Sequence, residues 1–353
     1  MKLRILILLV PLIFNYCKSE STEDIPKLTL KDNAYVKIIV DPSLDSILIN
    51  TFYSSSSPRQ SCVTHKLIKK EDGVYYTNYR TIRPDFVNIT IQDSSFNVYV
   101  IPKDTLTILV LANSRLNGKS LISYKIDDPI CTYLQKESRK YGSLYFLSPI
   151  VEQYYNSIPK SQKDFEKALQ IIDAAKNERL AFLQKNSNDL PVWFKNTQKW
   201  DYIYLSASLK YYQNYYLSNE NLMGFFPSVD VEICNPEAIL SGYYYNFLKD
   251  YYVLPYLDKN ITLTGPPRAI YLYNMALNKI ETTLKGEVLK YFNMYELISN
   301  YRASHTKEDI EAADKFAQSH NFQLNDSEKA FINQERSVVL NTIENQNKYF
   351  RPF

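Results

Sequence analysis

Glycine, histidine and paired cysteines are scarce in this chain, and their scarcity excludes several classes of function. Only 7 glycines and 3 histidines occur in 353 residues. The sequence contains no Gly-rich phosphate loop, no dinucleotide fingerprint, no Gly-x-Ser-x-Gly elbow and no His-Glu-x-x-His motif. His65, His305 and His320 match no Cys/His zinc spacing. The sequence therefore predicts no catalytic residue, no cofactor and no metal site, and it favours a protein that is not an enzyme.

A strong excess of one charge is also missing. The chain has 41 Lys and Arg residues against 38 Asp and Glu residues, and its net charge is only +3. No basic patch for nucleic acid is evident, so no nucleic-acid partner is expected. The 31 tyrosines are the main compositional excess. Because tyrosine has an apolar ring and a polar tip, this excess indicates packing between helices, and contact with sugars or partners is the alternative interpretation.

The most apolar run of the sequence stands at its start. Basic residues in the first four positions precede Ile5 to Phe14, which is shorter than the roughly 20 residues needed to span a bilayer. This pattern is typical of a secretory signal. Cys17 ends the run and a polar, acidic tether over 18–27 follows, which resembles a bacterial lipoprotein signal with Cys17 as the lipidated residue. Cleavage after Ser19 by the ordinary signal peptidase is the competing interpretation.

The signal at residues 1–17 predicts where the protein is located. We expect an exported cell-envelope protein, specifically an outer-membrane lipoprotein that faces the periplasm or the cell surface. Its membrane partner would be reached through acyl chains on Cys17, and two or more chains would be needed for a stable anchor.

The remaining cysteines form no recognised redox motif. If Cys17 is lipidated, Cys62, Cys131 and Cys234 remain, which is compatible with one disulfide and one free thiol. None of them forms a Cys-x-x-Cys pair. Cys62 stands three residues before His65, but on a strand these two side chains would point to opposite faces. We therefore expect Cys62 to be a core residue and not a nucleophile.

A small β-rich domain is predicted over 28–115. Short apolar runs separated by turn-forming residues recur there, and Asp72-Gly73 is a strong hairpin signal. The expected strands are Tyr35 to Val40, Ser46 to Phe52, Val74 to Tyr79, Phe86 to Ile91, Phe96 to Ile101 and Leu106 to Leu111. Such strands at regular spacing predict a small antiparallel β-sandwich or barrel.

The apolar period changes after Asp127-Asp128-Pro129, and an α-helical domain is predicted over 128–350. Steps of three and four residues between apolar side chains are typical of amphipathic helices. The expected helices are Ser161 to Asn186, Trp200 to Tyr216, Pro236 to Tyr252, a segment from Pro266 to Tyr301 interrupted near Gly286, Lys307 to His320 and Ser327 to Asn345. No 34-residue repeat is visible, so we expect an irregular bundle and an α+β fold overall.

The order of these features resembles the N-terminal, non-thioredoxin region of Bacteroidota thioredoxin-family thiol–disulfide oxidoreductase lipoproteins. The matching stretches are Tyr35 to Val40, Phe182 to Asn186 with Leu190 to Phe194, Gly242 to Tyr252, and Leu284 to Val288. The resemblance implies a catalytic thioredoxin-like domain where this sequence stops. Its Trp-Cys-x-x-Cys motif has no counterpart here, so no active-site residue is carried over.

Three functional hypotheses follow from these features. The first is a non-catalytic envelope lipoprotein that acts as a binding or scaffold module for a partner protein. The second is an accessory subunit to a separate thioredoxin-like oxidoreductase, which the resemblance implies as a partner. The third is a surface lipoprotein that binds glycans or peptides through exposed tyrosines, Trp193 and Trp200.

Overall fold

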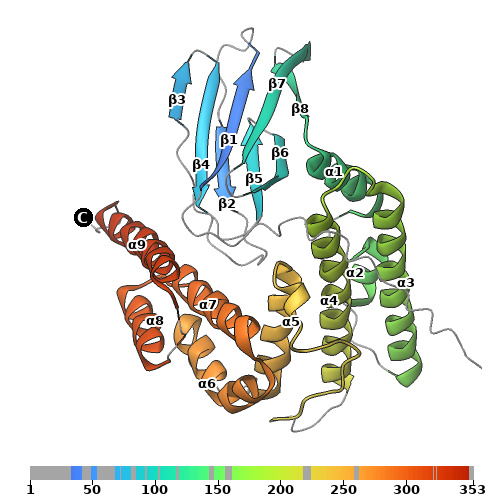
Figure 1. The fold of residues 1–353 in the computed structure, drawn as a ribbon, viewed down its shortest axis with the longest axis vertical. Coiled ribbons are helices and arrows are strands. Elements are labelled where there is room, and N and C mark those ends of the chain that lie inside the picture. The colour runs from blue at the N-terminus through green and yellow to red at the C-terminus, as the bar shows by residue number, and fades with distance from the viewer. Residues whose placement is uncertain are drawn as a thin grey trace, which may run out of the picture.

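The computed structural model confirms an α+β fold with strands in the first third of the chain and helices after it (Figure 1). It describes residues 33–349, apart from 42–48, 54–67, 72, 81–84, 92–93, 102–103, 117–118, 143–146, 156–160, 218–223, 258–261, 321 and 323. The predicted signal and tether therefore lie outside the described residues. In this part of the chain, no helix is both long and apolar enough to cross a membrane.

The strands form two open sheets. A five-stranded sheet has the order β3-β4-β1-β7-β8, and a three-stranded sheet has the order β2-β5-β6. The strands are β1 (Asn33–Val40), β2 (Ile49–Tyr53), β3 (Ile68–Glu71), β4 (Val74–Arg80), β5 (Asp85–Ile91), β6 (Ser94–Val100), β7 (Thr105–Leu116) and β8 (Lys119–Ile126). Neither sheet closes into a barrel, which was one of the two predicted forms.

One strand pair departs from the predicted antiparallel arrangement. β1 and β7 pair in parallel, with Tyr35 opposite Thr105 and Val40 opposite Val110. All other strand pairs in the described residues are antiparallel. Between β4 and β7 the chain forms β5 and β6 of the second sheet. It then returns to the first sheet as β7, which runs in the same direction as β1. This long-range return cannot be inferred from local alternation.

The β-rich part also extends past residue 115. β8 ends at Ile126, and the predictions did not include it. They also missed β3, whose sequence IKKE has little apolar character. The predicted Asp72-Gly73 turn joins β3 to β4, where Glu71 pairs with Val74 and Gly73 has a φ of 78°. That positive φ explains why glycine stands there.

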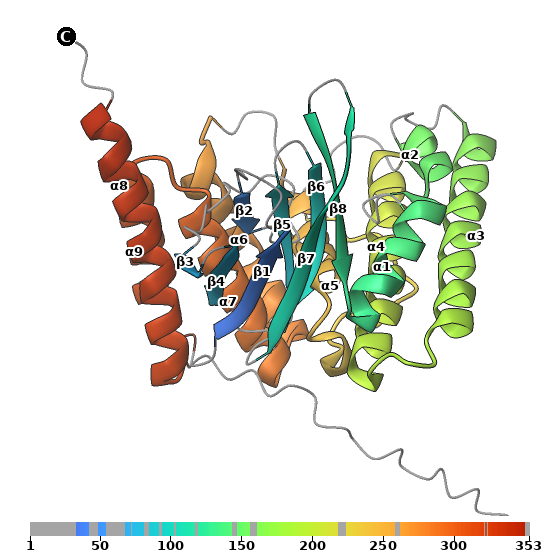
Figure 2. The ribbon, with the colours of Figure 1, turned by 90° about the horizontal axis from the view of Figure 1, so that it is seen from above.

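The helices form an arc below the strands, with α5 in its middle (Figure 1). They are α1 (Pro129–Tyr141), α2 (Pro149–Tyr155), α3 (Gln162–Asn186), α4 (Val192–Leu217), α5 (Gly242–Val253), α6 (Gly265–Thr283), α7 (Gly286–Arg302), α8 (Lys307–Ser319) and α9 (Asp326–Tyr349). Short 3-10 turns stand at η2 (Pro236–Ala238) and η3 (Leu254–Tyr256). Seen from above, α1 to α4 lie at one end of the molecule, and α8 and α9 lie at the other (Figure 2).

The break predicted near Gly286 is confirmed, because α6 ends at Thr283 and α7 begins at Gly286. The predicted N-cap at Ser161 is also confirmed, since its side chain accepts a hydrogen bond from the Asp164 backbone. These boundaries were accessible from sequence because cap residues act locally.

The two hydrophobic cores do not follow the predicted division between β-rich and helical domains. One core joins the strands to α1, α3 and one face of α4, which contributes Tyr202, Leu205 and Leu209. The other core joins α5 to α9 with the opposite face of α4, which contributes Tyr204 and Tyr211. Each set keeps helical spacing, so α4 is apolar on two faces. It is the element that both cores share.

Candidate functional site

The candidate site is a pocket of about 440 Å³ at the junction of the strands with α1. The pairing of β8 with β7 ends where Ile126 lies opposite Ile108. The first residues of β7, from Thr105 to Thr107, therefore have no partner in β8. The chain then turns through Asp127 into α1, and this departure leaves a hollow beside the start of β7. The lining residues are Tyr99, Ile101, Asp104, Thr105, Leu106, Thr107, Leu109, Lys125, Asp127 and Asp128.

The pocket is polar at its mouth and negatively charged. Three aspartates and one lysine line it, and Asp104, Lys125 and Asp127 are exposed. Two of the carboxylates accept hydrogen bonds from backbone N–H groups. Asp104 accepts one from the Thr105 backbone at 2.7 Å, and Asp128 caps α1. Asp127 has no such partner among the described residues. The pocket therefore suits a ligand that carries positive charge.

The first turn of α1 follows directly after the pocket residues Asp127 and Asp128. Asp128 accepts a hydrogen bond from the Cys131 backbone at 2.6 Å, and Pro129 stands at the first helical position. Asp128 is thus the N-cap residue of α1. Burial raises the pKa of the Cys131 thiol to about 12, although the Tyr99 backbone N–H bonds to its sulfur. A thiol with such a pKa is not a nucleophile at neutral pH.

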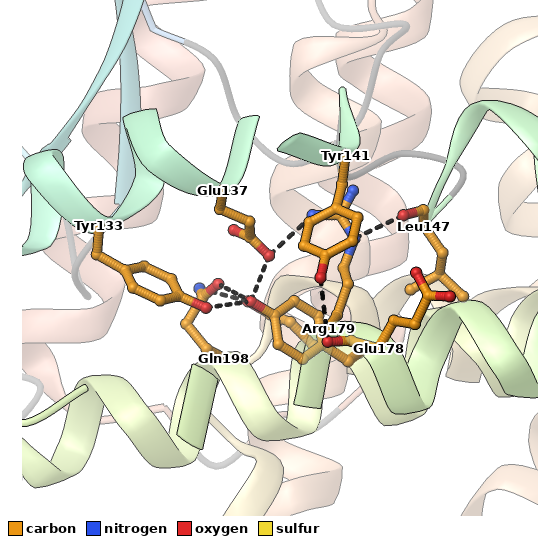
Figure 3. A network of polar contacts seen from close by, with 9 residues as sticks. Tyr133, Glu137, Tyr141, Leu147, Glu178, Arg179 and Gln198 are labelled. Carbon is orange, nitrogen blue, oxygen red and sulfur yellow. Dashed lines mark hydrogen bonds and ion pairs between the residues drawn. The ribbon is translucent and has the colours of Figure 1, made fainter. Parts of the chain in front are cut away.

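A buried polar network fastens α1 to α3 and α4 (Figure 3). Arg179 on α3 and Glu137 on α1 form an ion pair at 2.8 Å, with side chains only 1% and 4% exposed. Tyr202 on α4 donates its hydroxyl proton to the same Glu137 carboxylate. Because Tyr202 has one proton, Tyr133 must be the donor in the 2.9 Å contact between the two hydroxyls.

Both tyrosine hydroxyls in this network stay protonated. Burial is the largest cause, and the adjacent Glu137 carboxylate adds to it, so the pKa values of Tyr133 and Tyr202 lie well above the ordinary value. Neither of these two hydroxyls therefore ionises near neutral pH. The contacts of the network are enclosed and satisfied, which indicates that it positions α1.

The same network holds a strained residue. Leu147 is the only non-glycine residue with positive φ in the described part of the chain, at 62°. Its carbonyl accepts a hydrogen bond from Arg179 Nε at 2.6 Å, and its side chain is fully buried. A left-handed conformation costs a β-carbon residue roughly 1–2 kcal/mol. The Arg179 contact offsets that cost and fixes the connection into α2.

The predicted cysteine sites are not brought together. Cys131 and Cys234 are free thiols in different cores, so no disulfide joins them. The sulfur of Cys234 accepts a hydrogen bond from the Lys285 backbone at 3.4 Å. Cys17 and Cys62 lie outside the described residues, as does His65.

The proposed sugar-contacting tryptophans do not form an exposed platform. Trp193 is only 9% exposed and lies 6.2 Å from the Tyr99 ring in a stacked arrangement. Trp200 is partly buried against the second core. The prediction that Trp193 is exposed is therefore wrong, because it fills the space between the strands and α4.

No group of three or more potential metal ligands occurs in the residues that the structure describes. His320 instead stacks on Phe322 with ring centres 5.6 Å apart. His305 is exposed at the start of α8.

Two further carboxyl groups in the helical part have raised pKa values, and of these Glu296 is buried and Asp250 is half-buried. Asp250 on α5 accepts hydrogen bonds from Ser208 at 2.9 Å and Tyr212 at 3.0 Å, and burial raises its pKa to about 6. Glu296 on α7 is 2% exposed, with Lys249 as its ion-pair partner at 3.9 Å, and burial raises its pKa as well. Glu296 also raises the pKa of Asp250, so the two carboxyl groups are coupled.

Sequence reasoning missed the Glu137–Arg179 pair because it did not predict α1. A usable signal was present, since Asp128 followed by Pro129 combines a preferred N-cap with a preferred first helical residue. No protein-family model matches this chain, and no curated protein matches it either.

Proposed function

We propose that this chain is a non-catalytic cell-envelope lipoprotein that acts as a binding module, with the pocket beside α1 as its binding site. The pocket itself is the observation that supports binding. It is concave, it combines apolar walls with Thr105, Thr107 and Tyr99, and its charge is net negative. The enclosed Glu137–Arg179 network holds α1, which begins directly after the pocket residues Asp127 and Asp128.

Binding of cationic probes tests this proposal. Calorimetric titration of the chain with tri-lysine and with spermidine should show binding, whereas tri-glutamate should show none. Asp127→Lys should weaken tri-lysine binding by up to about fivefold, the upper value for one exposed ion pair. Asp189→Lys is the matched control, because Asp189 is an exposed aspartate between α3 and α4. Equal affinities for both variants and the parent chain would contradict the proposal.

The lipid anchor is supported by sequence alone. The run Ile5 to Phe14, Cys17 and the acidic tether after it are the features that favour lipidation over simple secretion. Expression with a labelled fatty acid should label the chain, and Cys17→Ser should abolish the label. Retained labelling in Cys17→Ser, or soluble release of the parent chain, would contradict the anchor.

We also propose that the two open sheets face each other as layers of a sandwich. Ile38 of the first sheet and Val98 of the second are both fully buried in one core, which supports this arrangement. Replacement of either residue by Ala should therefore leave a cavity in the same core. Leaving a cavity there should cost about 2–4 kcal/mol of unfolding free energy in a urea titration.

A further inference from the structure

An exposed apolar strip runs along α6 and the segments beside it. It consists of Phe225, Leu257, Leu263, Tyr271 and Met275, which are between 38% and 48% exposed. Tyr271 and Met275 are one turn apart on α6, and the buried residues of that helix face the other way. Leu263 stands just before the helix begins. Several half-exposed large side chains in one row are more than the scattered apolar residues of an ordinary surface.

Contacts near the other end of α6 link this helix to the segments that carry Phe225 and Leu257. The Gly224 backbone donates a hydrogen bond to the Pro255 carbonyl at 2.8 Å, which places Phe225 beside η3 and Leu257. The next residue, Phe226, lies with its ring 6.1 Å from that of Tyr256. The Lys279 ammonium of α6 sits 5.0 Å above the Phe226 ring. Lys279 is one turn after Met275, so the helix row meets the η3 region.

Two cations flank this strip without a carboxylate partner. Neither Arg268 nor Lys279 forms an ion pair with any residue that the structure describes. At 100° per residue, both cations fall on one flank of the Tyr271–Met275 row, and Glu281 falls on the opposite flank. An apolar row with cations along one side is complementary to an anionic surface that has an apolar interior.

We propose that the α6 strip is a membrane-contacting face that lies against anionic phospholipid. Tyr271 and Met275 enter the boundary between headgroups and acyl chains, and Arg268 and Lys279 contact lipid phosphates. The inference rests on the proposed function in one respect, because a lipid anchor at Cys17 is what keeps the chain near a bilayer. The strip then orients the protein on the membrane, which acyl chains on Cys17 alone do not do.

Vesicle binding by the chain from Lys18 onward tests the strip separately from the anchor. This chain keeps every described residue and carries no lipid, so lipidation does not affect the result. It should co-sediment with vesicles of phosphatidylcholine containing about one third phosphatidylglycerol, and added salt should weaken that binding. Binding to pure phosphatidylcholine should be weaker. Absence of binding to the anionic vesicles overturns the proposal, whether or not Cys17 is lipidated.

Three variants locate the contact. Arg268→Gln with Lys279→Gln should lower binding roughly 25-fold and remove most of its salt dependence, at about fivefold per cation. Tyr271→Ser with Met275→Ser should lower binding at least about tenfold. Ile150→Ser is the matched control, because Ile150 is 59% exposed on α2 and should leave binding unchanged. Circular dichroism melting checks that all variants fold.

Two outcomes of these measurements would overturn the membrane assignment. If all variants bind vesicles as the parent chain does, the contact lies elsewhere. If Tyr271→Ser with Met275→Ser abolishes self-association in light scattering while no form binds vesicles, the strip is an interface between copies of this chain.

Discussion

Replacement of Asp250 by Asn should make the protein more stable at pH 8 and leave it nearly unchanged at pH 4. Burial raises the pKa of this carboxyl from its ordinary 3.8 to about 6, so the folded chain binds more protons than the unfolded chain between those values. Unfolding free energy therefore falls as pH rises through this window. A shift of roughly two pKa units corresponds to about 3 kcal/mol above pH 6.

The local contacts allow this substitution. The side-chain oxygen of Asn can still accept a hydrogen bond from Ser208 or Tyr212, and the other hydroxyl can rotate to accept from the amide. Some of the gain is lost with the charged hydrogen bonds, so we expect a net stabilisation of about 1–3 kcal/mol at pH 8. Glu296→Gln should act in the same direction, because the two carboxyl groups raise each other's cost of ionisation.

The assay is urea unfolding followed by tryptophan fluorescence at pH 4, 6 and 8. Other groups titrate in the opposite direction, including Asp314, whose pKa is lowered mainly by its hydrogen bond with Arg336. The quantity to compare is therefore the difference between the variant and the parent chain at each pH. Asp189→Asn, at an exposed position, is the matched control. A difference for Asp250→Asn that is the same at pH 4 and pH 8 would refute the reasoning.

Three further predictions concern the site and the strands. Glu137→Gln should cost about 3–5 kcal/mol in urea unfolding, because it leaves the buried Arg179 without a charge partner, and Glu137→Met with Arg179→Met should recover most of that loss. Iodoacetamide at pH 8 should modify Cys234 in the native chain much faster than Cys131, and equal rates by peptide mapping would show that α1 is not held in place. Gly73→Ala should lower stability by roughly 1–2 kcal/mol, because its φ is 78° and the new β-carbon would lie 3.1 Å from a facing carbonyl oxygen; an unchanged melting temperature would contradict the turn.

Local signals explain which elements were predictable from the sequence. The Ser161 cap, the Asp72-Gly73 turn and the break near Gly286 each depend on a few neighbouring residues, and the structure contains all three. The same kind of signal was available but not used for α1, which Asp128 and Pro129 begin. For β8, the residue types alternate, with Ile122, Tyr124 and Ile126 separated by Ser123 and Lys125.

The candidate site depends on features that local patterns cannot reveal. The pocket exists because β8 ends opposite Ile108 while β7 continues to Thr105, and that offset is a property of strand pairing. The parallel return of β7 beside β1 likewise joins segments far apart in sequence. The contact of Glu137 with Arg179 required knowing how α1 and α3 pack. The sequence shows which residue types are present near the pocket, but it does not show that these residues lie close together.

Because α4 is apolar on two faces, it determines whether the chain can be cut into pieces that are stable separately. A protease cut between β8 and α1, at Asp127 and Asp128, would leave the strands without Leu205 and Leu209, and it would leave the helical piece with an uncovered apolar face. The two pieces would therefore be expected to stay associated after cleavage. Exchange of the strands alone for those of another protein would have to match the surface of α4. A unit that ended with α4 would uncover Tyr204 and Tyr211, so the strands and all the helices from α1 to α9 transfer only together.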